Sequence, residues 1–127
     1  MTGKDIKVLA VLGAHIGDCE VMSGGLAAKA VEEGWDVHFI HMTAGEKGHP
    51  SLPENEYFGQ KKKEAEEFGK DIGVSIHIMP YKDGELKETD DVKTKIGQLF
   101  REIRPSVVLT HWRGSFHRDH RATYAIV

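Results

Sequence analysis

The sequence is poor in cysteine and has no long apolar run. Its 127 residues include one cysteine, Cys19, so no disulfide can form within the chain. A single cysteine suits a reducing compartment, and we expect a cytoplasmic location. No segment approaches the roughly 18 consecutive apolar residues that a membrane span needs. Met1 to Lys7 lacks the apolar core of a signal peptide, so a secretory leader is not predicted.

The charge balance argues against a general nucleic-acid-binding protein. The formal net charge is -3, and the basic run Lys61-Lys62-Lys63 is local, as expected of a solvated helix face. Hydrophobic residues make up 39% and charged residues 29% of the chain, the balance of an ordinary globular protein. The length suits one domain spanning residues 1–127.

Strand-like and helix-like segments alternate along the chain. Short apolar runs predict buried strands at 7–12, 36–42, 75–79 and 106–110. Helical spacing predicts helices at 24–34, 54–72 and 90–104, with Asp90 as an N-cap, and a further helix from 121. This alternation predicts an α/β fold, a mostly parallel sheet with helices on both faces. Such sheets usually have about five or more strands. We therefore expect the sequence to be the N-terminal part of a longer chain.

Residues that bind metals gather where two of these strands end. His15 and Asp18 lie three residues apart, directly after the first strand. His117, Asp119 and His120 follow the fourth strand. Ligands of open parallel sheets bind at the carboxyl ends of the strands, so the two loops meet if the first and fourth strands are neighbours. Imidazole and carboxylate groups suit Zn²⁺, or another divalent metal, with one position left open for water. The same residue types also serve as turn and capping residues, and spacing alone leaves both interpretations open.

The two segments resemble the paired signatures of the LmbE/PIG-L family of zinc-dependent N-acetylglucosamine de-N-acetylases. Ala14-His15-x-x-Asp18-x-Glu20 is similar to the first signature, and His117-x-Asp119-His120 is similar to the second. Segments between them also match in the family's order, namely Thr43-x-Gly45-Glu46-x-Gly48, Glu64-Ala65, Ile72-Gly73 and Asp83-Gly84-Glu85-Leu86. The resemblance runs from residue 7 to 122 and implies a Rossmann-like three-layer fold.

The resemblance also implies an activity and a set of roles. The activity is hydrolysis of an N-acetyl group from an amino sugar or glycoconjugate by zinc-activated water. Metal ligation falls to His15, Asp18 and His120. His117 would polarise the oxyanion or protonate the leaving amine, and Asp119 would orient His117 or His120. Substrate contacts are expected from Asp83 and from Lys61, which stands where the family often has an arginine.

One departure from the family pattern concerns catalysis. The family has a general-base aspartate directly before the metal-binding aspartate, and this position is Gly17, which cannot accept a proton. Ile16 and Arg118 replace two signature prolines, and Ser115 replaces an aspartate. Loss of a general base typically lowers a rate by about 10²–10⁴. Candidates for a substitute are Glu20, Glu46 and Asp119, although Glu20 is expected in the first turn of the following helix.

Two other functions therefore compete with deacetylation. The first is a non-catalytic protein that keeps the metal or sugar site and lacks the base. The second is a nucleotide-binding domain, which the absence of a G-x-G-x-x-G spacing disfavours. An incomplete sheet with an exposed edge would also favour a homo-oligomer.

The remaining histidines and aromatic residues receive structural interpretations. His38 and His41 are expected to be packing or surface residues without partners. His111-Trp112 follows the fourth strand and is a candidate pocket wall, with a structural role preferred for Trp112. His49 is interpreted as part of a loop that covers the site.

Overall fold

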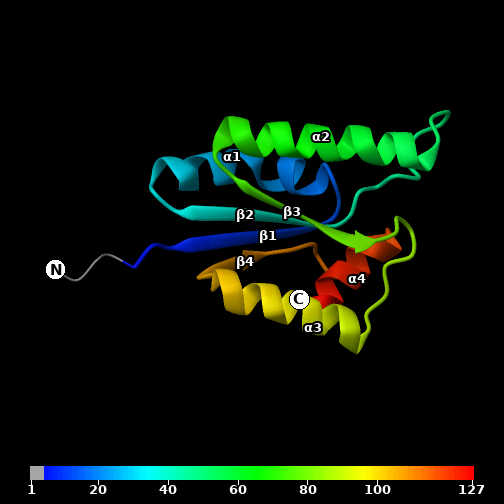
Figure 1. Ribbon diagram of the computed structural model, residues 1–127. Coiled ribbons are helices and arrows are strands. Elements are labelled where there is room, and N and C mark those ends of the chain that lie inside the picture. The colour runs from blue at the N-terminus through cyan, green and yellow to red at the C-terminus, as the bar shows by residue number, and fades with distance from the viewer. Residues whose placement is uncertain (1–4) are drawn as a thin grey trace.

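The computed structural model describes residues 5–127 and consists of four strands alternating with four helices (Figure 1). In chain order the elements are β1 (Val8–His15), α1 (Asp18–Glu32), β2 (Asp36–Thr43), α2 (Glu54–Ile72), β3 (Ser75–Tyr81), α3 (Asp90–Ile103), β4 (Val107–Leu109) and α4 (Arg118–Ile126). The prediction that Met1 to Lys7 is not a signal peptide falls partly on residues 1–4, which lie outside the described part. No helix within that part is long and apolar enough to cross a bilayer.

The strands form one parallel sheet in the order β3-β2-β1-β4. Helices α1 and α2 cover one face, and α3 and α4 cover the other, which gives three layers (Figure 1). The predicted α/β fold is therefore confirmed. Because β1 pairs with both β2 and β4, the loops after the first and fourth strands meet at one edge, as the metal-site hypothesis requires.

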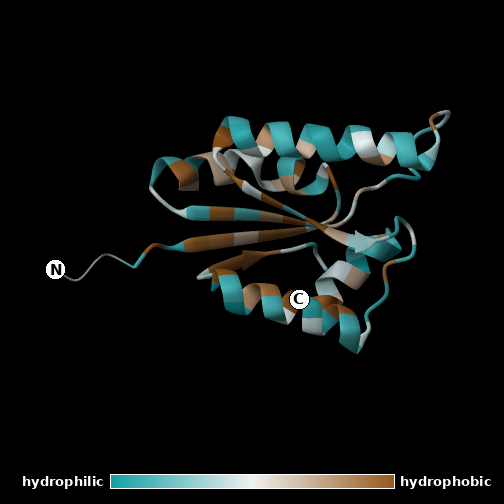
Figure 2. Ribbon diagram, viewed as in Figure 1, coloured by the Kyte–Doolittle hydropathy of each residue, from teal (hydrophilic) through white to brown (hydrophobic). Residues whose placement is uncertain are grey.

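The core lies in two layers, one on each face of the central strands. β1 is buried along almost its whole length, as expected of a strand covered by helices on both sides. Leu9 and Val11 pack towards Phe39, Ala27 and other residues under α1 and α2. The alternate side chains of β1 pack towards α3 and α4. The brown strands between helices with teal outer faces show this burial (Figure 2).

Several element boundaries differ from the sequence predictions. The first helix begins at Asp18 and not at Gly24, so most of the predicted loop 13–23 is strand or helix. The sequence conceals this start because the first turn carries Asp18 and Glu20 in place of an apolar stripe. The third helix is capped by Thr89, whose side chain accepts a hydrogen bond from the Val92 amide, and not by Asp90.

The last helix begins at Arg118 and not at residue 121, with His117 as its N-cap. The His117 side chain accepts a hydrogen bond from the Asp119 amide, which satisfies a free donor of the first turn. The second signature segment is therefore a helix start and not an extended loop. This fixes the direction of Asp119 and His120.

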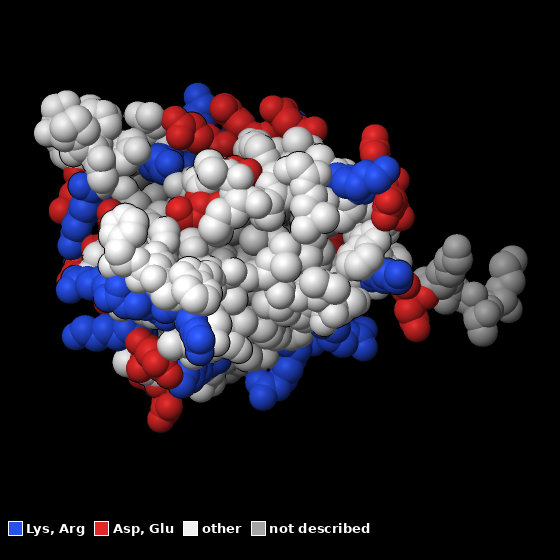
Figure 3. Space-filling model, turned by 180° about the vertical axis from the view of Figure 1, so that it is seen from behind, with Lys and Arg blue, Asp and Glu red and all other residues white. Residues whose placement is uncertain are grey.

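Outside the core, charged residues of both signs are mixed. On the face opposite to the view of Figure 1, Lys, Arg, Asp and Glu surround a broad uncharged area (Figure 3). Of the predicted lysine run, Lys62 and Lys63 are exposed as expected, whereas Lys61 is half-buried.

Candidate metal centre

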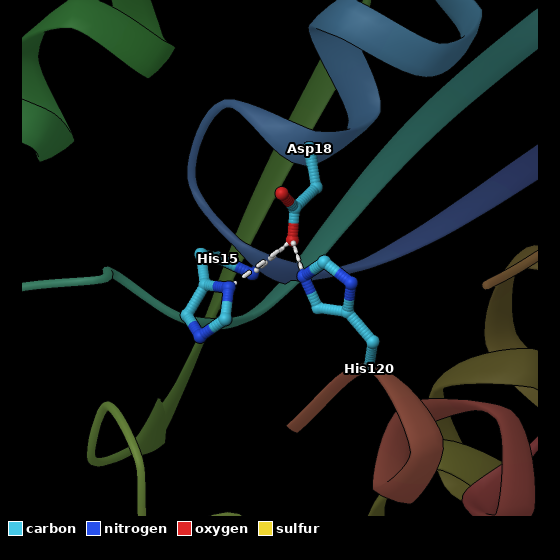
Figure 4. Close-up of side chains that lie close together, drawn as sticks. All are labelled: His15, Asp18 and His120. Carbon is cyan, nitrogen blue, oxygen red and sulfur yellow. Dashed lines mark hydrogen bonds and ion pairs between the residues drawn. The ribbon is translucent and has the colours of Figure 1, made fainter. Parts of the chain in front are cut away.

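The candidate site lies at the carboxyl edge of the sheet, where β1, α1 and α4 meet. His15 is the last residue of β1, Asp18 is the first residue of α1, and His120 lies in the first turn of α4. Both imidazoles turn towards the Asp18 carboxylate (Figure 4). The structure therefore brings together the three residues for which the family resemblance implies metal ligation.

The distances between these side chains suit a tetrahedral metal site. Asp18 Oδ2 lies 3.3 Å from His15 Nδ1 and 3.3 Å from His120 Nε2. Ligands held at about 2.0–2.1 Å in a tetrahedral zinc site lie about 3.3 Å from one another. One ligand atom from each residue lies within 4.8 Å of the other two. The donor set and its spacing thus fit a zinc ion.

The turn that presents Asp18 depends on Gly17. Gly17 has φ 113°, a conformation that residues with a side chain rarely adopt. Its amide donates to Glu20 Oε2 at 2.9 Å, which places Glu20 in the first turn of α1 as expected. The His15 amide in turn donates to Asp18 Oδ2 at 2.9 Å. The backbone of the turn therefore fixes the carboxylate.

His111, named in the sequence analysis only as a candidate pocket wall, contacts the candidate metal ligands. It is buried, its Nε2 lies 3.3 Å from Asp18 Oδ2, and its ring stacks on His120 with centroids 3.9 Å apart. Its Nε2 also accepts the Ala14 amide at 3.0 Å, so this nitrogen joins the loop after β4 to the end of β1. The position of His111 at the end of a strand was the available signal.

Trp112 is 68% exposed, so it is not a core residue, and its structural role stays a prediction. It lies on the loop between β4 and α4, beside the buried His111.

The Asp119 carboxylate contacts a different histidine from those expected, although the Asp119 amide donates to His117. The carboxylate is fully buried, and Oδ2 lies 2.9 Å from His15 Nε2 and accepts the Gly84 amide at 2.7 Å. The predicted partners were His117 and His120. The start of α4 turns the carboxylate inward to the strand end, and His120 Nδ1 is instead 3.2 Å from Ser115 Oγ.

Asp83 also lies against His15, with Oδ1 3.1 Å from Nε2. It belongs to the loop after β3, and its amide donates to Glu46 Oε1 at 2.9 Å. Asp83 is expected to contact the substrate, and in the structure it contacts His15, a candidate metal ligand. Lys61, the other residue expected to contact the substrate, lies on α2, and its side chain is half-buried.

Burial and neighbouring side chains shift the pKa values of the three candidate ligands. Burial disfavours the charged form of His15, but hydrogen bonds and charges from Asp18, Asp119 and Asp83 raise its pKa to about 9. Burial opposes ionisation of Asp18, yet the neighbouring His111 and His15 side chains and the His15 amide hold its pKa well below the usual range. Burial and the charge of His111 lower the pKa of His120, which favours the neutral, metal-binding form.

His38 and His41 have partners that the sequence interpretation did not provide. His38 Nδ1 lies 2.9 Å from His77 Nε2, and His38 Nε2 lies 3.0 Å from Asp36 Oδ2. His41 is fully buried, with Nε2 3.3 Å from Glu20 Oε1. The contacts of His38 with His77 and of His41 with Glu20 cross between elements, so they depend on the strand order and on the start of α1.

His49, interpreted from the sequence as part of a covering loop, accepts the amides of Ser51 and Leu52 through Nδ1 at 3.1 and 2.8 Å. These bonds hold the turn before α2. A covering role stays a prediction.

Comparison with known proteins shows which family the chain matches. Residues 10–127 match the family model described as PIG-L, GlcNAc-PI de-N-acetylase. Diacetylchitobiose deacetylase of Thermococcus kodakarensis is 29% identical over 125 residues, which cover 92% of this chain and 46% of that protein. The solved structure of N,N'-diacetylchitobiose deacetylase from Pyrococcus horikoshii, in complex with an inhibitor, gives a TM-score of 0.88 at 29% identity and covers 96% of this chain and 48% of that one.

A relative with a different reaction also matches. 4-Oxalmesaconate hydratase of Pseudomonas putida is 23% identical over 122 residues, which cover 90% of this chain and 47% of that protein. The chain thus spans about half the length of the curated relatives named here. The relatives share the fold, but they include a hydratase as well as deacetylases.

Proposed function

Because the chain belongs to the PIG-L family of GlcNAc-PI de-N-acetylases, we propose that it is a metal-dependent hydrolase that removes an N-acetyl group from an amino sugar or glycoconjugate. The observation that carries the proposal is the placement of Asp18 Oδ2 3.3 Å from both His15 Nδ1 and His120 Nε2. When bound, zinc supplies a Lewis acid that lowers the pKa of a water ligand to about 7.

The contacts around His15 support its role as a ligand. With Nδ1 directed to the metal position, Nε2 carries the proton and donates to Asp119 Oδ2 at 2.9 Å. A carboxylate on the far nitrogen fixes the tautomer and the direction of a metal-binding imidazole. We therefore assign Asp119 to positioning His15.

His117 is suited to donate a hydrogen bond or a proton to the reacting group. Its Nδ1 accepts the Asp119 amide at 3.1 Å, so in the neutral ring the proton resides on Nε2. Its ring lies edge-on to His15, with centroids 4.7 Å apart. An N–H at this place can stabilise negative charge that develops on the amide oxygen, or reach the leaving amine.

The identity of the general base is the open part of the mechanism. Glu20 Oε2 accepts the Gly17 amide, Glu46 Oε1 accepts the Asp83 amide, and Asp119 is directed at His15. All three candidate substitutes are thus engaged in contacts that hold the loops. We expect deacetylation slower by about 10²–10⁴ than in an enzyme with an aspartate at this position.

Metal analysis and a deacetylase assay test this function together. We expect about one zinc per chain in the purified protein, lost in Asp18→Ala and retained in Asp71→Ala, an exposed aspartate of α2. Acetate release from N-acetylglucosamine and diacetylchitobiose should disappear in His120→Ala. Hydrolysis that survives in His120→Ala would contradict the mechanism.

Gly17 favours a second candidate, a protein that binds metal and ligand without turnover. Zinc binding combined with no acetate release, under conditions in which a deacetylase of the family is active, would support this candidate. A water-addition assay on 4-oxalmesaconate, the compound named for the Pseudomonas putida relative, separates both from a hydratase activity.

A further inference from the structure

A second group of residues that can bind a metal lies outside the candidate metal centre. Asp36 and His38 are near the amino end of β2, and His77 is near that of β3, whereas the candidate metal centre is at the carboxyl edge of the sheet. His38 Nδ1 lies 2.9 Å from His77 Nε2, and His38 Nε2 lies 3.0 Å from Asp36 Oδ2. The three side chains thus form one continuous chain of contacts across two strands.

The register of the two strands brings both imidazoles to one face of the sheet. β2 and β3 are parallel, with Ile40 beside His77 and His38 beside Ser75. Side chains alternate along a strand, so His38, Ile40 and His77 face the same side, where Ile40 packs with core residues of α3 and α4. β3 is the outer strand of the sheet and is only partly buried, so His77 is in contact with solvent.

The contact with Asp36 determines which nitrogen of His38 is free to bind a ligand. A carboxylate accepts hydrogen bonds, so His38 Nε2 carries the proton and donates to Asp36 Oδ2. His38 Nδ1 therefore presents its lone pair to His77, whose Nε2 donates to it when no metal is bound. A carboxylate on the far nitrogen holds a metal-binding imidazole in the correct tautomer and increases its basicity. His38 is thus prepared to bind a metal through Nδ1.

The surroundings of His77 favour a cation and leave its ring neutral. Burial lowers the pKa of His77, and the nearby His38 and His41 act in the same direction. The carboxylates of Glu102 on α3 and Asp36 on β2 oppose this shift but do not reverse it. His77 is therefore neutral at about pH 7, the form that binds metal ions. The two carboxylates place negative charge beside the pair of imidazoles.

We propose that His38 Nδ1 and His77 Nε2 bind a divalent transition metal ion, Zn²⁺ or Cu²⁺, at the outer strand of the sheet. Imidazole suits both ions, and water completes the coordination. The metal takes the place of the proton between the two nitrogens, and this proton moves to His77 Nδ1, so that the ring stays neutral. The nitrogens are 2.9 Å apart and separate to about 3.3 Å, the spacing of two ligands of a tetrahedral zinc ion, as the rings turn towards the metal. The inference does not rest on the proposed hydrolase activity.

NMR spectroscopy tests the proposal residue by residue, because bound Cu²⁺ broadens the amide signals of nearby residues. We expect the signals of residues 36–38 and 75–77 to broaden in wild type by the second equivalent of Cu²⁺, since the first can fill the candidate metal centre. His77→Asn removes a ligand and should abolish this broadening. Asp36→Asn retains both ligands and should weaken Cu²⁺ binding at these strands about 10- to 100-fold, the usual effect of losing a carboxylate partner of a metal-binding histidine.

His49→Asn is the matched control, because it removes a histidine of the loop before α2, outside this group, and it should broaden like wild type. Unbroadened signals in wild type, or broadening that is undiminished in His77→Asn and Asp36→Asn, would overturn the proposal. Asp36 is an exposed residue, so its variant reads out even if His77→Asn does not fold. The measurement needs neither turnover nor a filled candidate metal centre, which separates this inference from the proposed function.

Discussion

Asp119 and His15 are 104 residues apart in the sequence, yet Asp119 Oδ2 lies 2.9 Å from His15 Nε2. The same oxygen accepts the Gly84 amide at 2.7 Å. One buried carboxylate therefore joins the start of α4, the end of β1 and the loop after β3. A substitution at this position should affect the metal site without removing a metal ligand.

We expect Asp119→Asn to lower zinc affinity about 10- to 100-fold, the usual effect of losing a partner of a metal-binding histidine. The amide preserves the shape of the side chain but not the negative charge that holds the His15 proton. Zinc affinity is measured by competition with a chromophoric chelator, and Asp71→Asn is the control. An unchanged affinity would show that Asp119 does not position His15.

The half-buried Glu20 and the fully buried His41 form a pair beside the turn that carries Asp18. Glu20 Oε1 lies 3.3 Å from His41 Nε2, while Oε2 accepts the Gly17 amide. We expect Glu20→Ala to lower the free energy of unfolding by about 1–3 kcal/mol, because it leaves buried polar groups without partners. Urea unfolding of metal-free protein measures the change. Exposed Glu66→Ala should stay within about 0.5 kcal/mol.

If Glu20 acts chiefly through the Gly17 amide, Glu20→Gln should destabilise less than Glu20→Ala. The glutamine retains an oxygen that can accept this hydrogen bond. Equal losses in the two variants would assign the stabilisation to the charge of the carboxylate facing His41.

Gly17 and Gly59 should respond to alanine in opposite ways. Gly17 has φ 113°, so Gly17→Ala should cost about 1–3 kcal/mol of stability through backbone strain. Gly59 lies inside helix α2, where an added Cβ meets no atom within 4 Å. Gly59→Ala should therefore stabilise the protein by about 0.5–1 kcal/mol. Equal effects on the midpoint of urea unfolding would contradict the assigned backbone conformation.

His77 should make stability depend on pH. Burial and the charge of nearby His38 lower its pKa, so the unfolded chain binds a proton more readily than the folded protein does. The free energy of unfolding should therefore fall as the pH drops below about 6.5, the pKa of histidine in an unfolded chain. The cost is absent above this pH and grows as the pH falls through the folded pKa.

The comparison is between wild type and His77→Asn, so that the contribution of this histidine is separated from that of the others. The stability of wild type relative to this variant should decrease between pH 7.5 and pH 5 in urea unfolding of metal-free protein. A difference that stays constant over this range would show that His77 does not titrate differently in the folded state.

Much of the fold could be predicted because burial leaves a local pattern. The apolar runs at 36–42 and 75–79 identified β2 and β3 to within two residues, and the helical spacing at 54–72 identified α2 with its bounds. The start of α1 escaped prediction because its first turn faces the site with Asp18 and Glu20. A helix start shaped by function lacks the apolar spacing on which such predictions depend.

Some features of the site could likewise be predicted from local sequence, and others could not. The three-residue spacing of His15 and Asp18 and their place after a strand are local, and sequence analysis singled them out. His111, the contact of Asp119 with His15 and the position of Lys61 beside Gly17 are not local. Each depends on which strands and helices are neighbours.

The sequence by itself thus determined the elements, the family and the residues able to bind a metal, because periodicity and short spacing act within one segment. The tertiary structure decided which partner each of these residues has. The parallel pairing of β1 with β4 places the first and last loops at one edge, and the placement of α1 and α2 on the same face of the sheet brings Lys61 to the turn at Gly17. Such contacts join segments far apart in the chain, and they exist only once the strand order is set.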